Sequence, residues 1–200
     1  DYGGTVGSLA MDNRGTIRNV SVSGNVTTNE KTIVVGGLVG TNIDEGTIAQ
    51  SRVSGNVTGG SVYLGGLVGN NRGTITQSGV SGNVTGRSRV GGLVGLNEDT
   101  ITQSGVSGDV TGGDEGGGLA GSVDSGQLTD TSASVTVDGT TAVGGLVGAT
   151  SGSVSVTNAT VSGNVTGENK VGGLVGDSSG EITNASASGT VSVPDDAEPT

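Results

Sequence analysis

Hydrophobic residues recur along the chain in four columns of seven members each, at intervals of 26 to 29 residues in the first column and 26 to 31 residues in the others. The first column contains Leu9, Leu38, Leu67, Leu93, Leu119, Leu146 and Leu174. The second contains Ile17, Ile48, Ile75, Ile101, Leu128, Val156 and Ile182. The third contains Val22, Val53, Val80, Val106, Ala133, Val161 and Ala187, and the fourth contains Val26, Val57, Val84, Val110, Val137, Val165 and Val191. A regular repeat of this length is typical of a chain that coils on itself.

The spacing between the columns separates rigid parts of each repeat from variable ones. The second and third columns are always 5 residues apart, and the third and fourth are always 4 apart. The first and second columns are 8 to 10 residues apart, and the fourth lies 9 to 12 residues before the next first. Constant spacing is expected within strands and variable spacing in loops. We therefore expect function in loops such as those between Leu38 and Ile48 and between Val57 and Leu67.

The constant stretches have the composition of β-strands. Val, Ile and Thr dominate them, as in Thr74-Ile75-Thr76, while Gly, Asn and Ser separate them. The 43 glycines argue against helix, since each costs a helix about 1 kcal/mol relative to alanine. We predict an all-β fold over residues 1–193, a single parallel β-solenoid of seven turns with three short strands per turn and a right-handed coil. A β-sandwich is the alternative, and residues 194–200 are expected to form an acidic, proline-containing tail or linker.

The repeated motif is similar to that of a known family. Gly36-Gly37-Leu38-Val39-Gly40 recurs four more times, followed in most turns by a Thr-Ile pair and then by Val-Ser-Gly-Asn-Val-Thr or a close variant. This succession resembles the GLUG-motif repeats of large secreted and cell-surface proteins, including bacterial adhesins, over roughly residues 3–193. The resemblance implies an extracellular stalk or display module. It transfers no catalytic residue, because such repeats have no known active site.

Composition agrees with a location outside the cell. The chain has no cysteine, and its 19 acids and 8 bases give a net charge of −11. Excess acidic charge with few lysines also suits the surface of a halophilic protein. The same charge argues against binding to nucleic acid or anionic membranes. No apolar run approaches the roughly 18 residues of a membrane span, so direct membrane insertion is not expected.

Asparagine in the Asn-X-Ser/Thr pattern provides the only candidate modification sites. They are Asn19, Asn25, Asn56, Asn83, Asn158, Asn164 and Asn184. In a secreted protein such residues accept glycans. The competing interpretation is structural, because Gly-Asn-Val-Thr belongs to the repeat and asparagine suits tight corners. A second polar row is expected to form hydrogen bonds along the solenoid axis, and the alternative is that it lines a ligand groove. Its members are Asn19, Gln50, Gln77, Gln103, Asp130, Asn158 and Asn184.

The sequence argues against catalysis and metal binding. Paired acids occur at Asp44-Glu45, Glu98-Asp99 and Asp114-Glu115, but their spacing fits no calcium loop, and adjacent carboxylates rarely face each other across a glycosidase cleft. The chain has no histidine, tryptophan or phenylalanine, so it lacks the usual general base and sugar-stacking platform. We expect no enzyme activity and no cofactor. Ice binding is disfavoured because Thr-Ile-Thr occurs in only two turns.

These observations predict a structural protein of the cell surface or of an extracellular appendage. A rigid β-solenoid would act as a stalk, or as a filament subunit that associates with itself end to end. The alternative is an adhesin module whose variable loops bind a surface glycan or protein.

Overall fold

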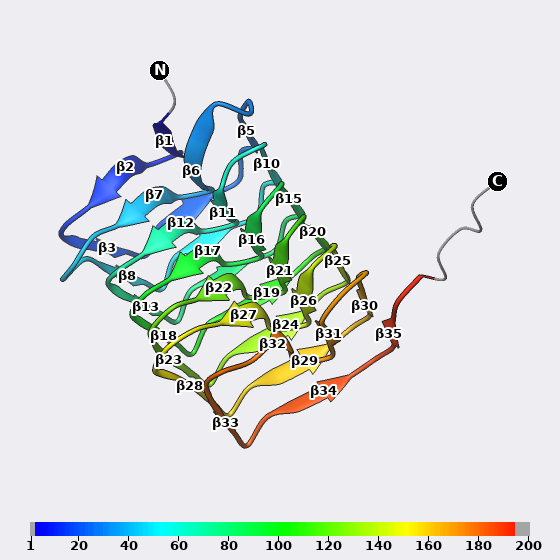
Figure 1. Ribbon diagram of the computed structural model, residues 1–200. Helices are drawn as coiled ribbons and strands as arrows, with labels where there is room; N and C mark the ends of the chain where they lie inside the picture. Colours follow the sequence, from blue (N-terminus) through cyan, green and yellow to red (C-terminus); the bar gives the residue numbers. More distant parts are fainter. Residues whose placement is uncertain (1–2, 195–200) are drawn as a thin grey trace.

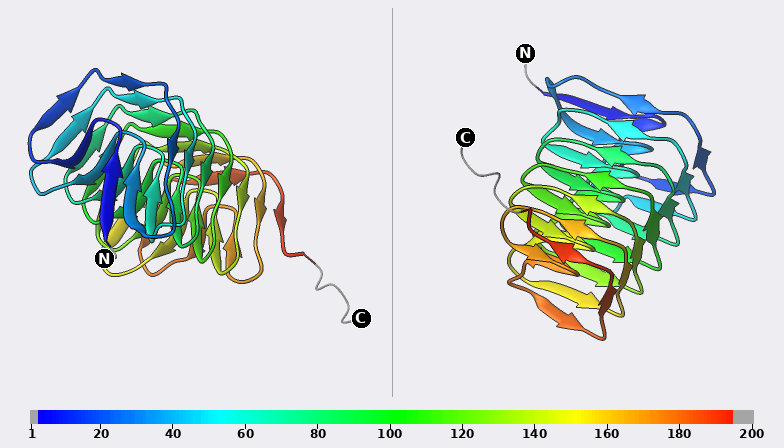
Figure 2. Two further views of the ribbon diagram at one scale, coloured as in Figure 1. Left: turned by 90° about the horizontal axis from the view of Figure 1, so that it is seen from above. Right: turned by 90° about the vertical axis from the view of Figure 1, so that its right-hand side faces the viewer.

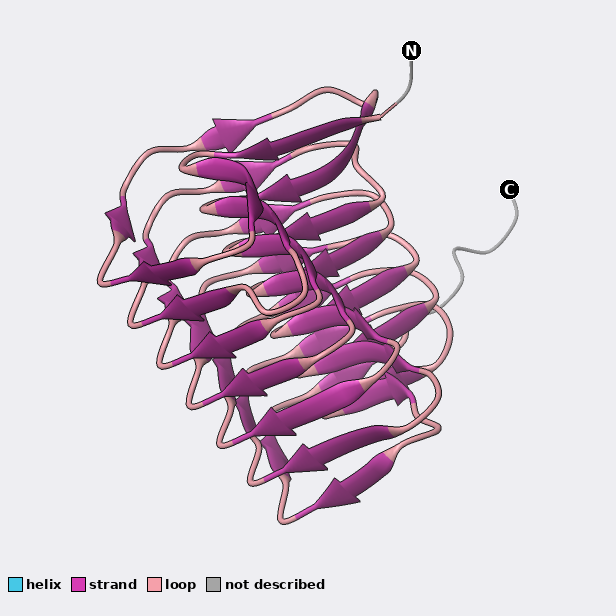
Figure 3. Ribbon diagram, turned by 90° about the vertical axis from the view of Figure 1, so that its left-hand side faces the viewer, coloured by secondary structure: helices cyan, strands magenta, loops and turns pink. Residues whose placement is uncertain are grey.

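The computed structural model describes residues 3–194 and shows one coil of short strands (Figure 1). All described regular structure is β-strand, as Figure 3 shows by colour. The strands form five parallel sheets of seven strands each, so every turn contributes one strand to each sheet. The prediction of an all-β parallel solenoid with seven turns is confirmed. Parallel pairing in all five sheets excludes the β-sandwich, whose sheets are antiparallel.

We name the sheets A to E in the order in which each turn enters them. Sheet A contains β1 (Gly4–Gly7), β6 (Thr32–Gly36), β11 (Tyr63–Gly65), β16 (Arg89–Gly91), β21 (Glu115–Gly117), β26 (Ala142–Gly144) and β31 (Val171–Gly172). Sheet B contains β2 (Ala10–Asn13), β7 (Val39–Asn42), β12 (Val68–Asn71), β17 (Val94–Asn97), β22 (Ala120–Val123), β27 (Val147–Thr150) and β32 (Val175–Asp177). Sheet C contains β3 (Thr16–Arg18), β8 (Thr47–Ala49), β13 (Thr74–Thr76), β18 (Thr100–Thr102), β23 (Gly126–Thr129), β28 (Val154–Thr157) and β33 (Glu181–Thr183).

The remaining two sheets carry the third and fourth hydrophobic columns. Sheet D contains β4 (Ser21–Val22), β9 (Arg52–Val53), β14 (Gly79–Val80), β19 (Gly105–Ser107), β24 (Ser132–Ser134), β29 (Thr160–Ser162) and β34 (Ser186–Ser188). Sheet E contains β5 (Val26–Thr27), β10 (Val57–Thr58), β15 (Val84–Thr85), β20 (Val110–Thr111), β25 (Val137–Asp138), β30 (Val165–Thr166) and β35 (Val191–Ser192).

The expected number of strands per turn was wrong, because each turn has five strands where three were predicted. The additional strand breaks occur at corners that were not predicted from the sequence. Gln50 and Gln77, for example, have φ of 52° and 50°, so the chain turns at a non-glycine residue between sheets C and D. A left-handed residue of this kind interrupts both the strand and the alternation, because Thr76 and Gln77 are both at least partly exposed between the buried Ile75 and Ser78.

The four hydrophobic columns form the interior of the coil. In the middle turns their members are buried, with Leu67, Ile75 and Val84 all at 0 % exposure. At the ends the same columns are uncovered, with Leu9 50 % exposed in the first turn and Val191 46 % exposed in the last. Each turn therefore buries its core against its neighbours, as expected for a solenoid. Figure 2 shows the stack from two further directions.

The Gly-Gly-Leu-Val-Gly motif connects sheets A and B where their backbones approach closely. Gly36 ends β6, Leu38 points into the core, and Val39 begins β7. A Cβ atom on Gly36 would overlap the carbonyl oxygen of Val39. The last glycine of the motif faces the turn before it, and a Cβ on Gly69 would lie 2.8 Å from the amide nitrogen of Val35. Glycine is required at both places because no side chain fits.

Candidate functional site

The outer surface of sheets D and E carries small polar side chains in straight columns. Inward and outward residues alternate from Ser51 to Thr58, so that Ser54, Asn56 and Thr58 face solvent while Val53 and Val57 are buried. One column is serine in all seven turns and is exposed throughout. Its members are Ser23, Ser54, Ser81, Ser107, Ser134, Ser162 and Ser188. This surface offers hydroxyl and amide groups but no aromatic side chain among its described residues.

Four of the sequon asparagines complete the backbone hydrogen bonding at the corner between sheets D and E. The Oδ1 atom of Asn25 accepts a hydrogen bond of 2.9 Å from the backbone N–H of Asn56 in the next turn. Asn56 and Asn83 repeat the arrangement at 2.9 and 3.0 Å, and Asn164 does so at 3.0 Å. The side-chain amide thus stabilises a backbone group at the point where the ladder bends. The structural interpretation of these asparagines has direct support.

The other three sequon asparagines, Asn19, Asn158 and Asn184, lie at the left-handed corners between sheets C and D. They belong to the second polar row, whose seven members have φ between 48° and 56°. The expected axial hydrogen bonding within this row is found at one pair among the described residues, where Asn158 Nδ2 donates to Asp130 Oδ1 at 3.0 Å. Backbone conformation explains the row better, because Asn and Asp tolerate left-handed geometry more readily than most residues. All seven sequon asparagines are exposed, and their glycosylation stays a prediction.

A shallow groove of about 340 Å³ crosses the outer surface of sheet D. Gly79 and Gly105 form its floor, and Arg52 stands at one end. Gln77 and Gln103 belong to its lining, so the second polar row does contribute to a groove. The groove lies outside the variable loops, where function was expected.

A buried asparagine ladder runs through the first four turns at the end of sheet B, and the sequence reasoning missed it. Asn13 donates to Asn42 at 2.7 Å, Asn42 to Asn71 at 2.8 Å, and Asn71 to Asn97 at 2.7 Å. Asn42, Asn71 and Asn97 are fully buried. The signal was present in the sequence, since each of the four lies four residues after the leucine of its turn. The ladder stops at Val123, the fifth member of that column.

Comparison with known proteins agrees with these repeats. The family model described as "Glug: The GLUG motif" matches residues 86–111 and 167–192. Two of the seven repeats therefore match the GLUG motif. The two matched segments are the fourth and seventh turns of the solenoid, β16 to β20 and β31 to β35. No curated protein and no solved structure matches the chain.

Two of the three acid pairs each contribute one ion-pair partner between turns of the solenoid. Glu98 lies 2.7 Å from Arg72 Nε, and Glu115 lies 2.7 Å from Arg89 Nε, in both cases one turn apart. Among residues 3–194 no three His, Cys, Asp or Glu side chains lie together in a way that could hold a metal ion. The same part of the chain contains no helix that could cross a membrane.

Arg89 has the most elaborate environment of any charged residue in the GLUG solenoid. Its guanidinium donates to Glu115, lies 3.3 Å from the Tyr63 hydroxyl and sits 5.4 Å from the centre of the Tyr63 ring. Burial lowers the pKa of Arg89, but the hydrogen bond and negative charge of Glu115 outweigh it, so the pKa is raised. Arg89 is therefore a fixed positive charge that joins the third, fourth and fifth turns.

Proposed function

We propose that the GLUG solenoid is a non-catalytic structural protein, a rigid stalk on the cell surface or in an extracellular appendage. The continuity of five parallel sheets through all seven turns carries this proposal. Each inner turn is hydrogen-bonded to its neighbours in all five sheets, and the turns above and below cover its core. Bending such a rod requires hydrogen bonds in several sheets to lengthen together, so the rod resists bending.

The positions of the chain ends suit a stalk. The described chain enters at the first turn and leaves at the last, at opposite ends of the stack (Figure 1). Groups attached to the two ends are therefore separated by the whole length of the solenoid. This separation is the proposed mechanism, and it needs no binding site.

Met11 favours a single rod over a filament built by stacking copies in register. Met11 stands where the later turns have the last glycine of the GLUG motif, because Ala10 and Asp12 pair with the residues on either side of Gly40. A Cβ at this position in the third to seventh turns would lie 2.5 to 2.9 Å from an amide nitrogen of the preceding turn. A second copy placed before the first turn would bring Val171 of its last turn against Met11. A second copy with standard turn geometry therefore does not fit in register before the first turn.

This reasoning is tested by the association state of two variants. We expect the wild-type protein to sediment as a monomer at all concentrations and to appear as single short rods in negative-stain micrographs. Met11→Gly removes the obstruction and should allow end-to-end chains at high concentration, because Leu9 and Val191 leave apolar surface at the two ends. Met11→Ala is the matched control, since its Cβ retains the clash. Regular wild-type filaments would overturn the stalk proposal, and monomeric Met11→Gly would overturn the role of Met11.

An extracellular location is part of the proposal and has its own support. The chain has no cysteine, carries a net charge of −11 and exposes all seven sequon asparagines. A strongly acidic surface maintains solubility in concentrated salt, which also suits a halophilic source. Mass spectrometry of surface material from the native source would test both location and glycosylation. Recovery of the unmodified protein from the cell interior alone would contradict this part.

A second candidate function is an adhesin module, favoured by the polar groove on sheet D. This groove provides a defined surface hollow with a charged residue at its end. Binding there is compatible with a stalk, because the groove lies on the side of the rod and leaves both ends free.

A further inference from the structure

The groove on sheet D exists because two successive turns lack an outward side chain. The column that contains its floor is Ser21, Arg52, Gly79, Gly105, Ser132, Thr160 and Ser186. Five of the seven turns carry a side chain in this column, and only the third and fourth turns carry glycine. The hollow is therefore about two turns long and runs parallel to the solenoid axis.

The backbone does not require glycine at these two positions. Neither Gly79 nor Gly105 has a positive φ. A Cβ on Gly79 would meet only the carbonyl oxygen of Gly105 at 3.1 Å and Arg52 Nη1 at 4.0 Å. A Cβ on Gly105 would lie 2.6 Å from the Oγ atom of Ser132, so that hydroxyl would have to rotate away. Ser132 and Thr160 occupy the same column in later turns without disturbing the sheet. Glycine within a strand costs about 0.5–1 kcal/mol relative to alanine, so the hollow is maintained at some expense of stability.

The groups around the hollow are suited to a ligand that carries both negative charge and hydroxyls. Among the described residues no carboxylate lies within ion-pair distance of Arg52, whose Nη1 reaches over the floor at Gly79. Gln77 and Gln103 follow one another along the axis, and their left-handed backbone fixes where their side chains leave the surface. Ser81 and Ser107 add a second pair of polar groups to the lining. A guanidinium binds a carboxylate through two hydrogen bonds, and amides and hydroxyls bind sugar hydroxyls.

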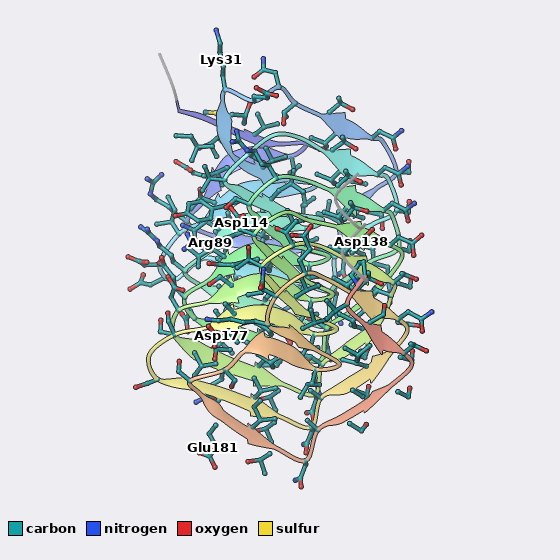
Figure 4. The ribbon with its side chains drawn as sticks, turned by 45° about the vertical axis from the view of Figure 1, so that its right-hand side comes forward. Lys31, Arg89, Asp114, Asp138, Asp177 and Glu181 are labelled. Carbon is teal, nitrogen blue, oxygen red and sulfur yellow. The ribbon has the colours of Figure 1, made fainter. Side chains whose placement is uncertain are left out.

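The distribution of charge along the rod permits an anionic ligand in this place. Residues 3–112 contain seven acids and seven bases, whereas residues 113–194 contain eight acids and one base. In Figure 4, Lys31 lies at the N-terminal end, and Asp177 and Glu181 lie towards the other end. The groove is lined mainly by turns two to four and contains no acidic residue. The net charge of −11 therefore does not exclude a negatively charged ligand here.

We propose that this groove binds an oligosaccharide containing uronic acid, with a sugar carboxylate on Arg52. The sugar chain lies along the axis, so that successive units contact Gln77 and Gln103, while Ser81 and Ser107 contact hydroxyls on the other side. A neutral sugar is a poor ligand, because no aromatic side chain lines the groove to stack on it. The proposal does not depend on the stalk function.

The probe is a galacturonate tetramer, titrated into the isotopically labelled protein in calcium-free buffer and followed by amide chemical shifts. We expect shifts confined to the groove, binding that weakens with added salt, and no saturable shifts with maltotetraose, the neutral control. Arg52→Gln should weaken binding about tenfold, or about 1.4 kcal/mol, and Arg52→Lys should weaken it less. Arg87→Gln is the matched control, because Arg87 is also without an ion pair among the described residues and lies outside the groove.

Gly79→Ser provides a second, independent variant, since serine is accepted in this column elsewhere. It should abolish binding by filling the floor while leaving the circular dichroism spectrum and urea midpoint close to those of the wild type. Equal shifts with the neutral tetramer, equal weakening by Arg52→Gln and Arg87→Gln, or full binding by folded Gly79→Ser would each overturn the proposal. Absence of any shift would also overturn it, and none of these results bears on the rod tested with Met11.

Discussion

Replacing the buried Asn71 by alanine should destabilise the solenoid more than replacing an exposed asparagine. Asn71 accepts a hydrogen bond from Asn42 and donates to Asn97 and to the carbonyl oxygen of Gly73, at 2.7 to 2.8 Å. Three hydrogen bonds at about 1 kcal/mol each are lost. The buried Oδ1 of Asn97 also loses its donor, which costs about 1–3 kcal/mol. We expect the free energy of unfolding to fall by about 4 kcal/mol.

Urea denaturation followed by circular dichroism measures this change. With an m value of about 3 kcal/mol per molar urea, the midpoint should fall by about 1 M or slightly more. Asn83→Ala is the matched control, because Asn83 lies in the same turn but is exposed and accepts a single hydrogen bond from the backbone N–H of Asp109. Its expected cost is about 0.5–1 kcal/mol.

The comparison between the two variants decides whether the ladder stabilises the fold. If Asn71→Ala and Asn83→Ala lower the urea midpoint equally, then a buried amide of the ladder contributes no more to stability than an exposed amide at the corner between sheets D and E. A loss below about 1 kcal/mol for Asn71→Ala would refute the reasoning, because a buried acceptor without a donor is the main cost predicted. Unchanged circular dichroism spectra before denaturation must accompany either result.

Three further outcomes follow from the structure. Gly69→Ala should cost several kcal/mol in urea denaturation, because its Cβ would lie 2.5 Å from Val34 Cγ1, whereas Gly15→Ala should change stability little, because nothing lies within 4 Å of its Cβ. Arg89→Gln should cost about 0.5 kcal/mol, less at high salt. The cost should be constant between about pH 6 and pH 9: the raised pKa of Arg89 means that its contribution is lost only in strong alkali. If glycans are attached, mass spectrometry should find that occupancy of Asn56 excludes occupancy one turn away, since adjacent turns are only about 4.8 Å apart.

The inward-facing residues could be predicted from the sequence because burial imposes a simple rule. A side chain such as Ile75 must be apolar in every turn, and the column remains visible even though loop lengths vary. The number of strands could not be predicted, because the polar row that contains Gln77 suggests axial hydrogen bonding and does not reveal the left-handed backbone that forms the corner. Left-handed φ is uncommon outside glycine, so a glutamine in that conformation is not expected from composition.

The groove and the ladder were hidden for a different reason. Both are columns of residues, and the role of each column depends on whether its side chains point into the core or towards solvent. Asn71 and Asn83 have the same residue type, but one is buried in a ladder and the other caps a backbone N–H at the surface. Likewise, Gly79 is one of 43 glycines, and nothing in the sequence distinguishes it from the others. It becomes notable only when its column is known to contain serine, threonine or arginine in five of the seven turns. Only an alignment of columns with an assigned inner and outer face separates these cases.

The same reasoning gives the repeat a direction. The last glycine of each GLUG motif packs against the turn before it, so the requirement for glycine falls on the later turn of each pair. In the first described turn Met11 occupies this position, on a strand (β2) that pairs only with the turn after it. The last described turn has Gly176 at the standard glycine position and leaves Val191 exposed, so its geometry matches that of the inner turns. The stack therefore has a direction, because at each junction the later turn must carry the glycine, and the Met11→Gly variant tests whether the first described turn obeys the same rule.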